Sequence, residues 1–110
     1  MLSTYRVLDL TDHRAQLAGH ILRSLGADVI LVEPPAGSPA RAIGPFVGDV
    51  ADPERSLSFW AHNRGKKSVV LDLDSEAGRD RFLELVRGAD VLLENEPLGT
   101  LVLDGLPAMR

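Results

Sequence analysis

The sequence contains no cysteine, and this absence excludes several kinds of function. Disulfide bonds, thiolate metal sites and a cysteine nucleophile all depend on the sulfur of that residue. The three histidines do not replace it, because His13 and His20 stand seven positions apart and no third ligand has suitable spacing. The sequence therefore predicts no metal site.

A broad positive charge and a long apolar run are also missing. The net charge of -4 argues against a surface that binds DNA backbones, so no nucleic-acid partner is expected. No apolar stretch approaches the roughly 18 residues that a membrane-spanning helix needs. The first residues lack the basic segment and apolar run of a signal peptide. We therefore expect no membrane partner and a cytoplasmic location.

What the chain does contain fits one globular unit. Its 110 residues are 45% hydrophobic and 25% charged, which is ordinary for a folded domain. This length is enough for one compact core and not for two. The sequence predicts a single domain over residues 1–110.

Short apolar runs alternate with amphipathic stretches along this domain. Strands are predicted at 6–10, 29–32, 68–73 and 91–93. The first helix has an apolar stripe, and its members are Leu17, Ala18, Ile21, Leu22 and Leu25. Thr11 or Asp12 would cap the start of this helix, and Gly26 would close its end in a left-handed conformation.

A second full helix is predicted after the third strand. Asp74 or Ser75 would cap it, and its apolar face contains Ala77, Phe82, Leu85, Val86 and Ala89. Strands that alternate with helices form right-handed crossovers and hence a parallel sheet. The predicted fold is α/β, a Rossmann-like parallel sheet of about four strands with flanking helices.

Two segments depart from this alternation. Residues 35–53 form a proline-rich loop without regular structure, which in a compact domain is usually functional or disordered. The tail at 97–110 is too apolar for a free terminus, so we expect it to pack on further protein. Between them, a short helix at 56–62 carries Phe59 and Trp60, which we interpret as core residues rather than a base-stacking platform.

Ligands of open parallel sheets bind beyond the carboxyl ends of the strands. Here those ends are followed by 9–14, 33–35, 73–74 and 94–96. A dinucleotide site is disfavoured, because the first turn lacks G-x-G-x-x-G and Asp12 would oppose a pyrophosphate. No phosphate-binding P-loop motif occurs either.

The densest group of cations is the turn that contains Arg64, Lys66 and Lys67. These side chains lie beside Gly65 and could hold phosphates by charge-assisted hydrogen bonds, with Arg41 as a fourth cation. A solvated turn before a strand is the alternative, and spacing alone does not decide between them. The phosphate interpretation requires His13, Arg41 and this turn to converge at one rim of the sheet.

Several motifs together resemble the opening of class III CoA-transferases, the formyl-CoA and carnitine type. The motifs are Arg6–Thr11, Leu25–Ile30 with Val32–Pro35, Asn63–Val69 with Leu71–Leu73, and Ala89–Leu92 with Glu94–Asn95. They occur in the order and at the spacing of the family, and they cover nearly the whole chain.

The resemblance implies a Rossmann-like domain that holds coenzyme A, in a dimer of interlocked chains. CoA and acyl-CoA would be substrates rather than permanently bound cofactors, and a carboxylic acid would be the second substrate. By analogy with the family, the residues that contact CoA are His13, Arg14, Pro34, Arg41, Leu71 to Asp74 and Asn95. The family moves CoA between carboxylic acids through an aspartate nucleophile.

The chain also departs from the family pattern. The aspartate nucleophile of the family lies beyond the segment that this sequence covers, so no catalytic residue is expected here and the isolated chain should be inactive. Glu96 replaces an aromatic residue, Leu103 stands where a basic residue is common, and Asp74 where a lysine is common. These changes should weaken phosphate binding by a few kcal/mol in total.

Three functions remain open at this point. The chain is a CoA-transferase domain that needs a downstream portion, a non-catalytic CoA-binding or interaction module, or a diverged remnant truncated relative to the family. We expect it to form a homo-oligomer or to dock with a downstream CoA-transferase portion.

Overall fold

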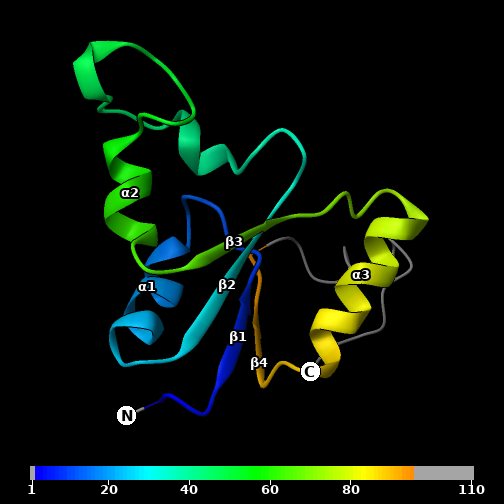
Figure 1. The fold of residues 1–110 in the computed structure, drawn as a ribbon. Coiled ribbons are helices and arrows are strands. Elements are labelled where there is room, and N and C mark those ends of the chain that lie inside the picture. The colour runs from blue at the N-terminus through cyan, green and yellow to red at the C-terminus, as the bar shows by residue number, and fades with distance from the viewer. Residues whose placement is uncertain (1, 96–110) are drawn as a thin grey trace.

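The structure, a computed structural model, describes residues 2–95 of the chain. Four strands form one parallel sheet in the order β3-β2-β1-β4, as Figure 1 shows. The strands are β1 (Arg6–Asp9), β2 (Asp28–Glu33), β3 (Lys67–Val70) and β4 (Val91–Leu93). The helices are α1 (Gln16–Ser24), α2 (Leu57–Asn63) and α3 (Glu76–Arg87). The predicted four-stranded parallel α/β fold is confirmed.

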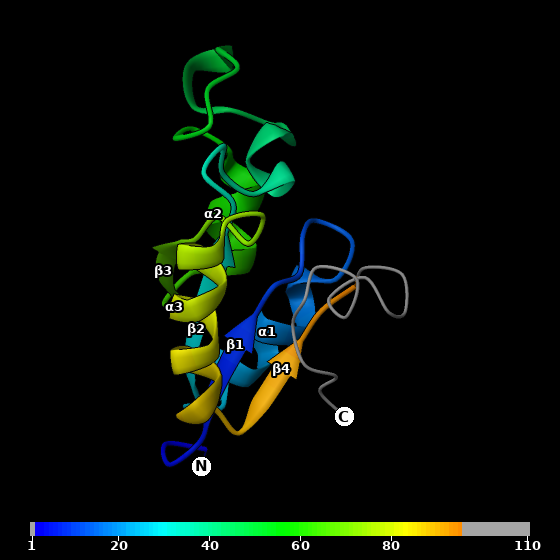
Figure 2. The same ribbon diagram turned by 90° about the vertical axis from the view of Figure 1, so that its right-hand side faces the viewer.

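Alternating residues of the central strands face two separate cores. Leu8, Ile30 and Val32 pack with Phe82 of α3 on one face of the sheet. Val7 and Val29 pack with Ala27 and Leu22 on the opposite face, beside α1. Figure 2 shows α3 on one side of the sheet and α1 and α2 on the other. Because both faces are covered, the inner strands are apolar on both sides.

Of the two ends predicted for α1, only the C-terminal one is found as predicted. Gly26 follows the helix with a φ of 101°, the left-handed conformation predicted for it. The start is different, because Ala15 occupies the N-cap position and no side chain caps the helix. Asp12 is engaged by the Arg14 side chain and Thr11 by Asp9, so the predicted capping role of either residue is wrong.

The apolar stripe of α1 is only partly buried. Leu17 and Ile21 are about half exposed, whereas Gln16 and Gly19 are buried. The helix therefore presents a face to the sheet that includes a polar residue and a glycine. The reason is a buried ion pair of Asp9 in β1 with Lys66 in the turn before β3, which lies against α1 at Gly19 and which the apolar periodicity does not reveal.

The proline-rich loop contains two short 3-10 helices, η1 (Pro39–Ala42) and η2 (Val47–Asp49). The prediction of no regular structure in this loop is therefore corrected. Serine side chains stabilise the segment: Ser38 Oγ accepts the Ala40 N–H at the start of η1. Ser56 Oγ donates to the Ile43 carbonyl and accepts the Phe59 N–H at the start of α2.

The two aromatic residues of α2 have different surroundings. Phe59 is buried, with 7% of its surface exposed, and packs with Leu31 and Ala40. Trp60 is 48% exposed, so its predicted place in the core is wrong. Consecutive residues of an α-helix point about 100° apart around its axis, so Phe59 and Trp60 cannot both face the same neighbours.

None of the helices in residues 2–95 has the length and apolar character to cross a membrane. The apolar tail predicted at 97–110 lies outside the described residues.

Candidate functional site

The loops that follow β1 and β4 meet at the carboxyl edge of the sheet. These strands are neighbours, so their ends lie side by side. Asn95 Nδ2 donates to Asp12 Oδ1 at 2.8 Å, and this hydrogen bond links the two loops. Arg14 grips the same carboxylate with Nε and Nη2, the latter at 2.8 Å from Oδ2. Asp12 is therefore the organising group of this part of the edge.

The charge of Asp12 is fixed by its neighbours. Hydrogen bonds from the Arg14 side chain hold the pKa of the Asp12 carboxyl well below its usual range, against the opposing effect of partial burial. His13 is exposed, with Nδ1 at 3.9 Å from Asp12 Oδ1. The carboxylate is thus ionised at every physiological pH.

One polar atom at this edge has no partner. Asn95 Oδ1 is buried and accepts no hydrogen bond from residues 2–95, although its Nδ2 is engaged by Asp12. A buried amide oxygen without a donor loses its interaction with water and gains nothing in return. A ligand with an N–H or O–H group would satisfy it.

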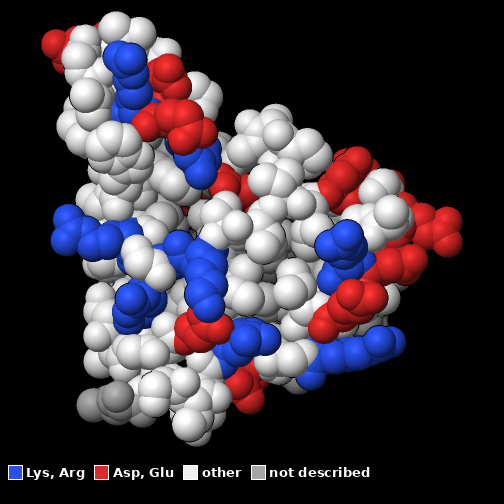
Figure 3. Space-filling view, in the orientation of Figure 1, with Lys and Arg blue, Asp and Glu red and all other residues white. Residues whose placement is uncertain are grey.

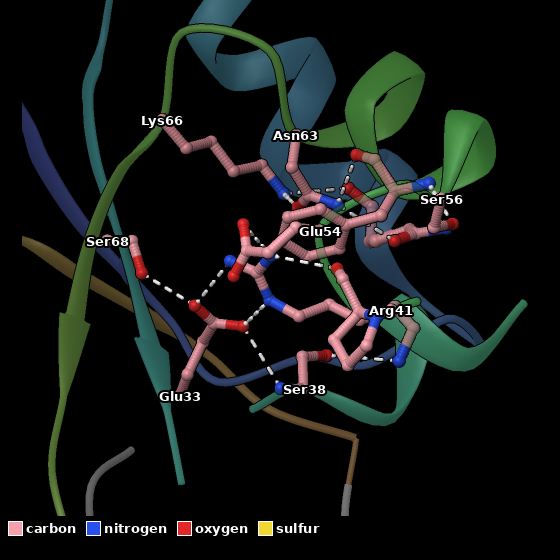
Figure 4. A network of polar contacts seen from close by, with 12 residues as sticks. Glu33, Ser38, Arg41, Glu54, Ser56, Asn63, Lys66 and Ser68 are labelled. Carbon is pink, nitrogen blue, oxygen red and sulfur yellow. Dashed lines mark hydrogen bonds and ion pairs between the residues drawn. The ribbon is translucent and has the colours of Figure 1, made fainter. Parts of the chain in front are cut away.

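A second cluster forms where β2 ends and the proline-rich loop begins. Glu33 is 3% exposed and binds Arg41 through two hydrogen bonds, from Nε at 2.7 Å and Nη2 at 3.0 Å. Ser68 Oγ donates to Glu33 at 2.6 Å, and the Ser38 N–H donates at 3.0 Å. Figure 4 shows Glu33 at the centre of these contacts. The cluster attaches the loop to the end of the sheet.

Hydrogen bonding determines the protonation of Glu33. Burial alone would raise the pKa of this carboxyl, but hydrogen bonds from Arg41, Ser68 and the Ser38 N–H outweigh it and lower the pKa to about 2. The same pairing raises the pKa of Arg41. Arg41 also lies over the ring of Phe59, at 4.1 Å from its centroid. Its charge is therefore already compensated in the structure.

Arg41 lines a hollow within the proline-rich loop. The hollow measures about 330 Å³ and its walls include Ser38, Arg41 and Phe46. Arg41 Nη1 donates to the Pro53 carbonyl and lies 3.6 Å from Glu54 Oε2. Because Glu54 is 82% exposed, this outer contact is weak compared with the buried pair to Glu33.

The turn between α2 and β3 is not part of this rim. Lys66 is buried and its Nζ lies 2.7 Å from Asp9 Oδ2. Lys67 Nζ points instead to Asp28, the first residue of β2, at 3.1 Å. The structure therefore places these two ammonium groups in an interior pair and towards the amino edge. The expected convergence with His13 and Arg41 is wrong for the two lysines, because Lys66 is buried against Asp9 and Lys67 lies beside Asp28 at the amino edge.

Arg64 differs from its neighbours in the turn. Its exposed side chain lines a hollow of about 510 Å³ together with Leu57 and Trp60. No carboxylate partner is found for it among residues 2–95. Figure 3 shows that over most of one face the Lys and Arg side chains lie beside Asp and Glu, with no broad cationic surface.

The remaining predicted contacts lie at the carboxyl edge. Pro34 is exposed directly after β2, and Leu71 and Asp74 lie in the segment between β3 and α3. The Leu71 N–H donates to the Glu33 carbonyl, which brings that segment next to the end of β2. The structure thus groups Pro34, Leu71 and Asp74 on the same edge as His13, Arg14, Arg41 and Asn95.

Sequence reasoning missed the carboxylates that hold these cations. Asp9 and Glu33 each end a strand, and both are buried and paired. Two signals were present in the sequence: a carboxylate at a strand end, and the lone Gly19 inside a helical stripe. Together they indicate a buried polar contact that requires close approach of helix and strand.

Comparison with known proteins places the chain in a family. The family model described as CoA-transferase family III matches residues 2–106. The chain is 41% identical over 104 residues to succinyl-CoA:(R)-benzylsuccinate CoA-transferase subunit BbsE of Thauera aromatica. It is 43% identical over 104 residues to succinyl-CoA:mesaconate CoA-transferase of Haloarcula hispanica. The matches cover 94% and 91% of this chain.

Solved structures agree with these sequence matches. A crystal structure of Rv3272 from Mycobacterium tuberculosis superposes with a TM-score of 0.83 at 41% identity, over 97% of this chain. A CAIB/BAIF family protein from Brucella suis gives a TM-score of 0.83 at 40% identity, over 94% of this chain.

The chain spans about a quarter of the length of these relatives. It covers 25% of the Thauera protein, 26% of the Haloarcula protein and 28% of the Rv3272 chain. Within that quarter the match runs through every described strand and helix. The chain belongs to CoA-transferase family III and corresponds to the N-terminal part of its members.

Proposed function

We propose that this chain supplies the CoA-binding part of a CoA-transferase, at the carboxyl edge of its sheet. The observation that carries the proposal is the family match over residues 2–106, together with the site geometry at that edge. The relatives are named as transferases that use succinyl-CoA with benzylsuccinate or mesaconate. Acyl-CoA and a carboxylic acid are accordingly the proposed substrates.

The proposed contacts follow the geometry of the edge. Asn95 Oδ1 has no donor within the described part of the chain and is the proposed acceptor of a hydrogen bond from the nucleotide. Asp12 holds the Asn95 amide in place for this contact. His13, Arg14 and Arg41 supply donors to the phosphates, and Pro34, Leu71 and Asp74 form the walls. Because Asp12 and Glu33 compensate the two arginines, phosphate recognition relies on hydrogen bonds more than on net charge.

We propose that catalysis needs polypeptide outside these residues. By its resemblance to the family, an aspartate outside this sequence attacks the acyl-CoA thioester, forms a mixed anhydride and expels the CoA thiolate. The thiolate then attacks the aspartyl carbonyl of the anhydride, which forms an enzyme-CoA thioester and releases the acyl group as its carboxylate. The chain alone would bind CoA without exchanging the acyl group. A cytoplasmic location, and a homo-oligomer or a complex with a downstream portion, belong to the same proposal.

Calorimetric titration of the purified chain with CoA and acetyl-CoA tests this proposal, together with an assay for thioester exchange. Micromolar binding without exchange is the expected result. Replacement Asn95→Leu should weaken CoA binding at least tenfold, because the hydrogen bond to the nucleotide is lost. Turnover by the chain alone would contradict the proposed place of the nucleophile, and absence of binding would contradict the site.

A charge change provides a gain-of-binding control. Asp74→Lys places a cation at the proposed phosphate edge and should tighten CoA binding several-fold. Asp80→Lys makes the same change of charge at an exposed position farther along α3 and should have little effect. Equal effects of the two variants would indicate a non-specific response to net charge.

A second candidate function is a non-catalytic interaction module. Trp60 is half exposed, and Arg64 has no carboxylate partner within residues 2–95; both line one hollow. They favour this function because tryptophan and arginine are enriched at interface centres. Light scattering with size-exclusion chromatography distinguishes the two functions. An oligomer that is lost in Trp60→Ala, in a chain that binds no CoA, would support the module.

A further inference from the structure

The ammonium group of Lys66 is fully engaged by hydrogen-bond acceptors inside the protein. Its side chain is 1% exposed, and the side chain of Asp9 is fully buried. The ammonium group donates to Asp9 Oδ2 at 2.7 Å, to Asn63 Oδ1 at 2.7 Å and to the Gln16 carbonyl at 3.1 Å. Each of its three protons therefore has an acceptor inside the protein, and none is left for a ligand.

Two of these acceptors, on Asp9 and Gln16, lie at the two ends of one loop, and the third, Asn63, lies at the end of α2. Asp9 ends β1, and its second oxygen accepts both the N–H and the hydroxyl of Thr11. Gln16 begins α1, and its side-chain oxygen accepts a hydrogen bond from Asn63 Nδ2 at 3.0 Å. One ammonium group thus fixes the start and the end of the segment that carries Asp12, His13 and Arg14.

Gly19 shows that α1 is built around this ion pair. A Cβ atom at this position would lie 2.2 Å from Asp9 Oδ2 and 3.0 Å from Lys66 Nζ. Glycine weakens a helix interior, so its presence here needs a reason. The reason is close approach, because any side chain at position 19 would displace Asp9 or the ammonium group.

We propose that Lys66 is a positioning residue for CoA binding: its buried ammonium group holds the loop between β1 and α1 in the conformation that presents Asp12 and Arg14 at the carboxyl edge. Lys66 makes no contact with CoA in this arrangement. The inference rests on the proposed function for the role of the loop, whereas its structural part concerns the free chain.

The test compares two lysine variants that differ by one position. Lys66→Met removes the buried ammonium group. Lys67→Met makes the same change in side chain and net charge at an exposed lysine. Hydrogen exchange of the Thr11 and Arg14 amides is measured in the free chain, because these amides donate to the Asp9 and Asp12 side chains. The central amides of α3 report overall stability, and calorimetry with CoA gives the affinity.

We expect Lys66→Met to accelerate exchange at Thr11 and Arg14 at least tenfold more than in α3, and to weaken CoA binding at least tenfold. Lys67→Met should change both quantities less than threefold. Equal acceleration in α3 and in the loop would overturn the inference, because Lys66 would then act on global stability alone. Unchanged exchange in the loop would overturn it as well.

A milder variant decides the matter if Lys66→Met does not fold. Thr11→Val removes only the hydroxyl that donates to Asp9, and it should accelerate exchange at Arg14 relative to α3 by a smaller factor. The exchange measurement needs no ligand. If the parent chain binds no CoA, the proposed function fails, while the exchange result still confirms or refutes the positioning of the loop.

Discussion

Glu33 is the residue that attaches the start of the proline-rich loop to the end of the sheet. It is buried at the end of β2 and accepts hydrogen bonds from Arg41, Ser68 and the Ser38 N–H. These bonds lower its pKa from 4.5 to about 2, so the unfolded chain binds the proton more readily than the folded one. Stability from Glu33 is therefore complete above about pH 4.5 and is lost as the pH falls towards 2.

Replacement Glu33→Gln should flatten the acid side of the stability profile. The shift of the Glu33 pKa corresponds to about 3 kcal/mol of stability that the parent loses between pH 5 and pH 2. The variant lacks this titration, so its free energy of unfolding should fall by about 3 kcal/mol less over the same range. Urea denaturation followed by circular dichroism at several pH values measures the difference.

Glu54→Gln is the matched control for that prediction. Glu54 also lies near Arg41, but it is 82% exposed. An exposed pair of this kind contributes at most about 1 kcal/mol, so the acid profile of the control should follow the parent. An identical profile for Glu33→Gln and the parent would show that Glu33 is not the titrating group.

The identity of the carboxylate that pairs with each cation could not be predicted from the individual residues. Lys66 and Lys67 are adjacent in sequence, yet one is buried against Asp9 and the other is exposed beside Asp28. A list of charged residues cannot separate these cases, because pairing depends on the position of strands distant in sequence. This is why phosphate ligands were predicted at residues that the structure commits to ion pairs.

The start of helix α3 is marked by a serine cap and an acidic first turn. Ser75 Oγ accepts the Gly78 N–H at 3.0 Å, and Glu76 adds an acidic residue in the first turn. Of the two caps considered from the sequence, Asp74 or Ser75, the structure identifies Ser75. The cap satisfies one of the free N–H groups of the helix and should contribute about 1 kcal/mol.

Two replacements at Ser75 separate the cap from other roles of the residue. Ser75→Ala removes the acceptor and should lower the free energy of unfolding by about 1 kcal/mol. Ser75→Asp keeps an acceptor and should stay within about 0.5 kcal/mol of the parent. Chemical denaturation of the three proteins checks the order. Equal stability of the alanine and aspartate variants would exclude a capping role.

Most of the fold could be predicted because its elements are local patterns. Continuous apolar runs indicated strands with both faces covered, and the structure places them in a parallel sheet. The face of α1 could not be predicted in the same way. Periodicity favoured Leu17 and Ile21 as buried, whereas the helix buries Gln16 and Gly19 around the pair of Asp9 and Lys66. A buried polar contact between distant segments overrides an apolar stripe.

At the scale of the whole molecule, Trp60 reports on what covers the α2 surface. It is the only tryptophan in the sequence and is 48% exposed, next to Leu57 and Arg64. The fluorescence of the monomeric chain should resemble that of a partly solvated indole and be quenched readily by acrylamide. Blue-shifted emission that resists quenching in a verified monomer would contradict the structure.

The same probe detects docking with further CoA-transferase polypeptide. Tryptophan at an interface loses its contact with water, so binding at α2 should shift the emission to the blue and reduce quenching. Trp60→Phe removes the signal and serves as the blank. Binding without a change in emission would place the interface elsewhere on the chain.

The edge at which the candidate residues lie was easier to predict than their contacts with one another. Strand order and the rule for parallel sheets brought Pro34, Asn95 and the loop at Asp12 to one edge. The role of Asp12 as a bridge between Arg14 and Asn95 depends on the adjacency of β1 and β4, which are far apart in sequence. Local motifs contain no information on that adjacency.

Asp28 compensates part of the positive charge at the amino edge of the sheet. Its single carboxylate pairs with both Arg6 and Lys67 at the amino edge, with separations of 3.2 and 3.1 Å. Conversion of this one carboxylate to an amide would leave two neighbouring cations unmatched on the surface. A single substitution in this acidic domain would thus create a local cationic site that attracts polyanions, far from the edge assigned to CoA.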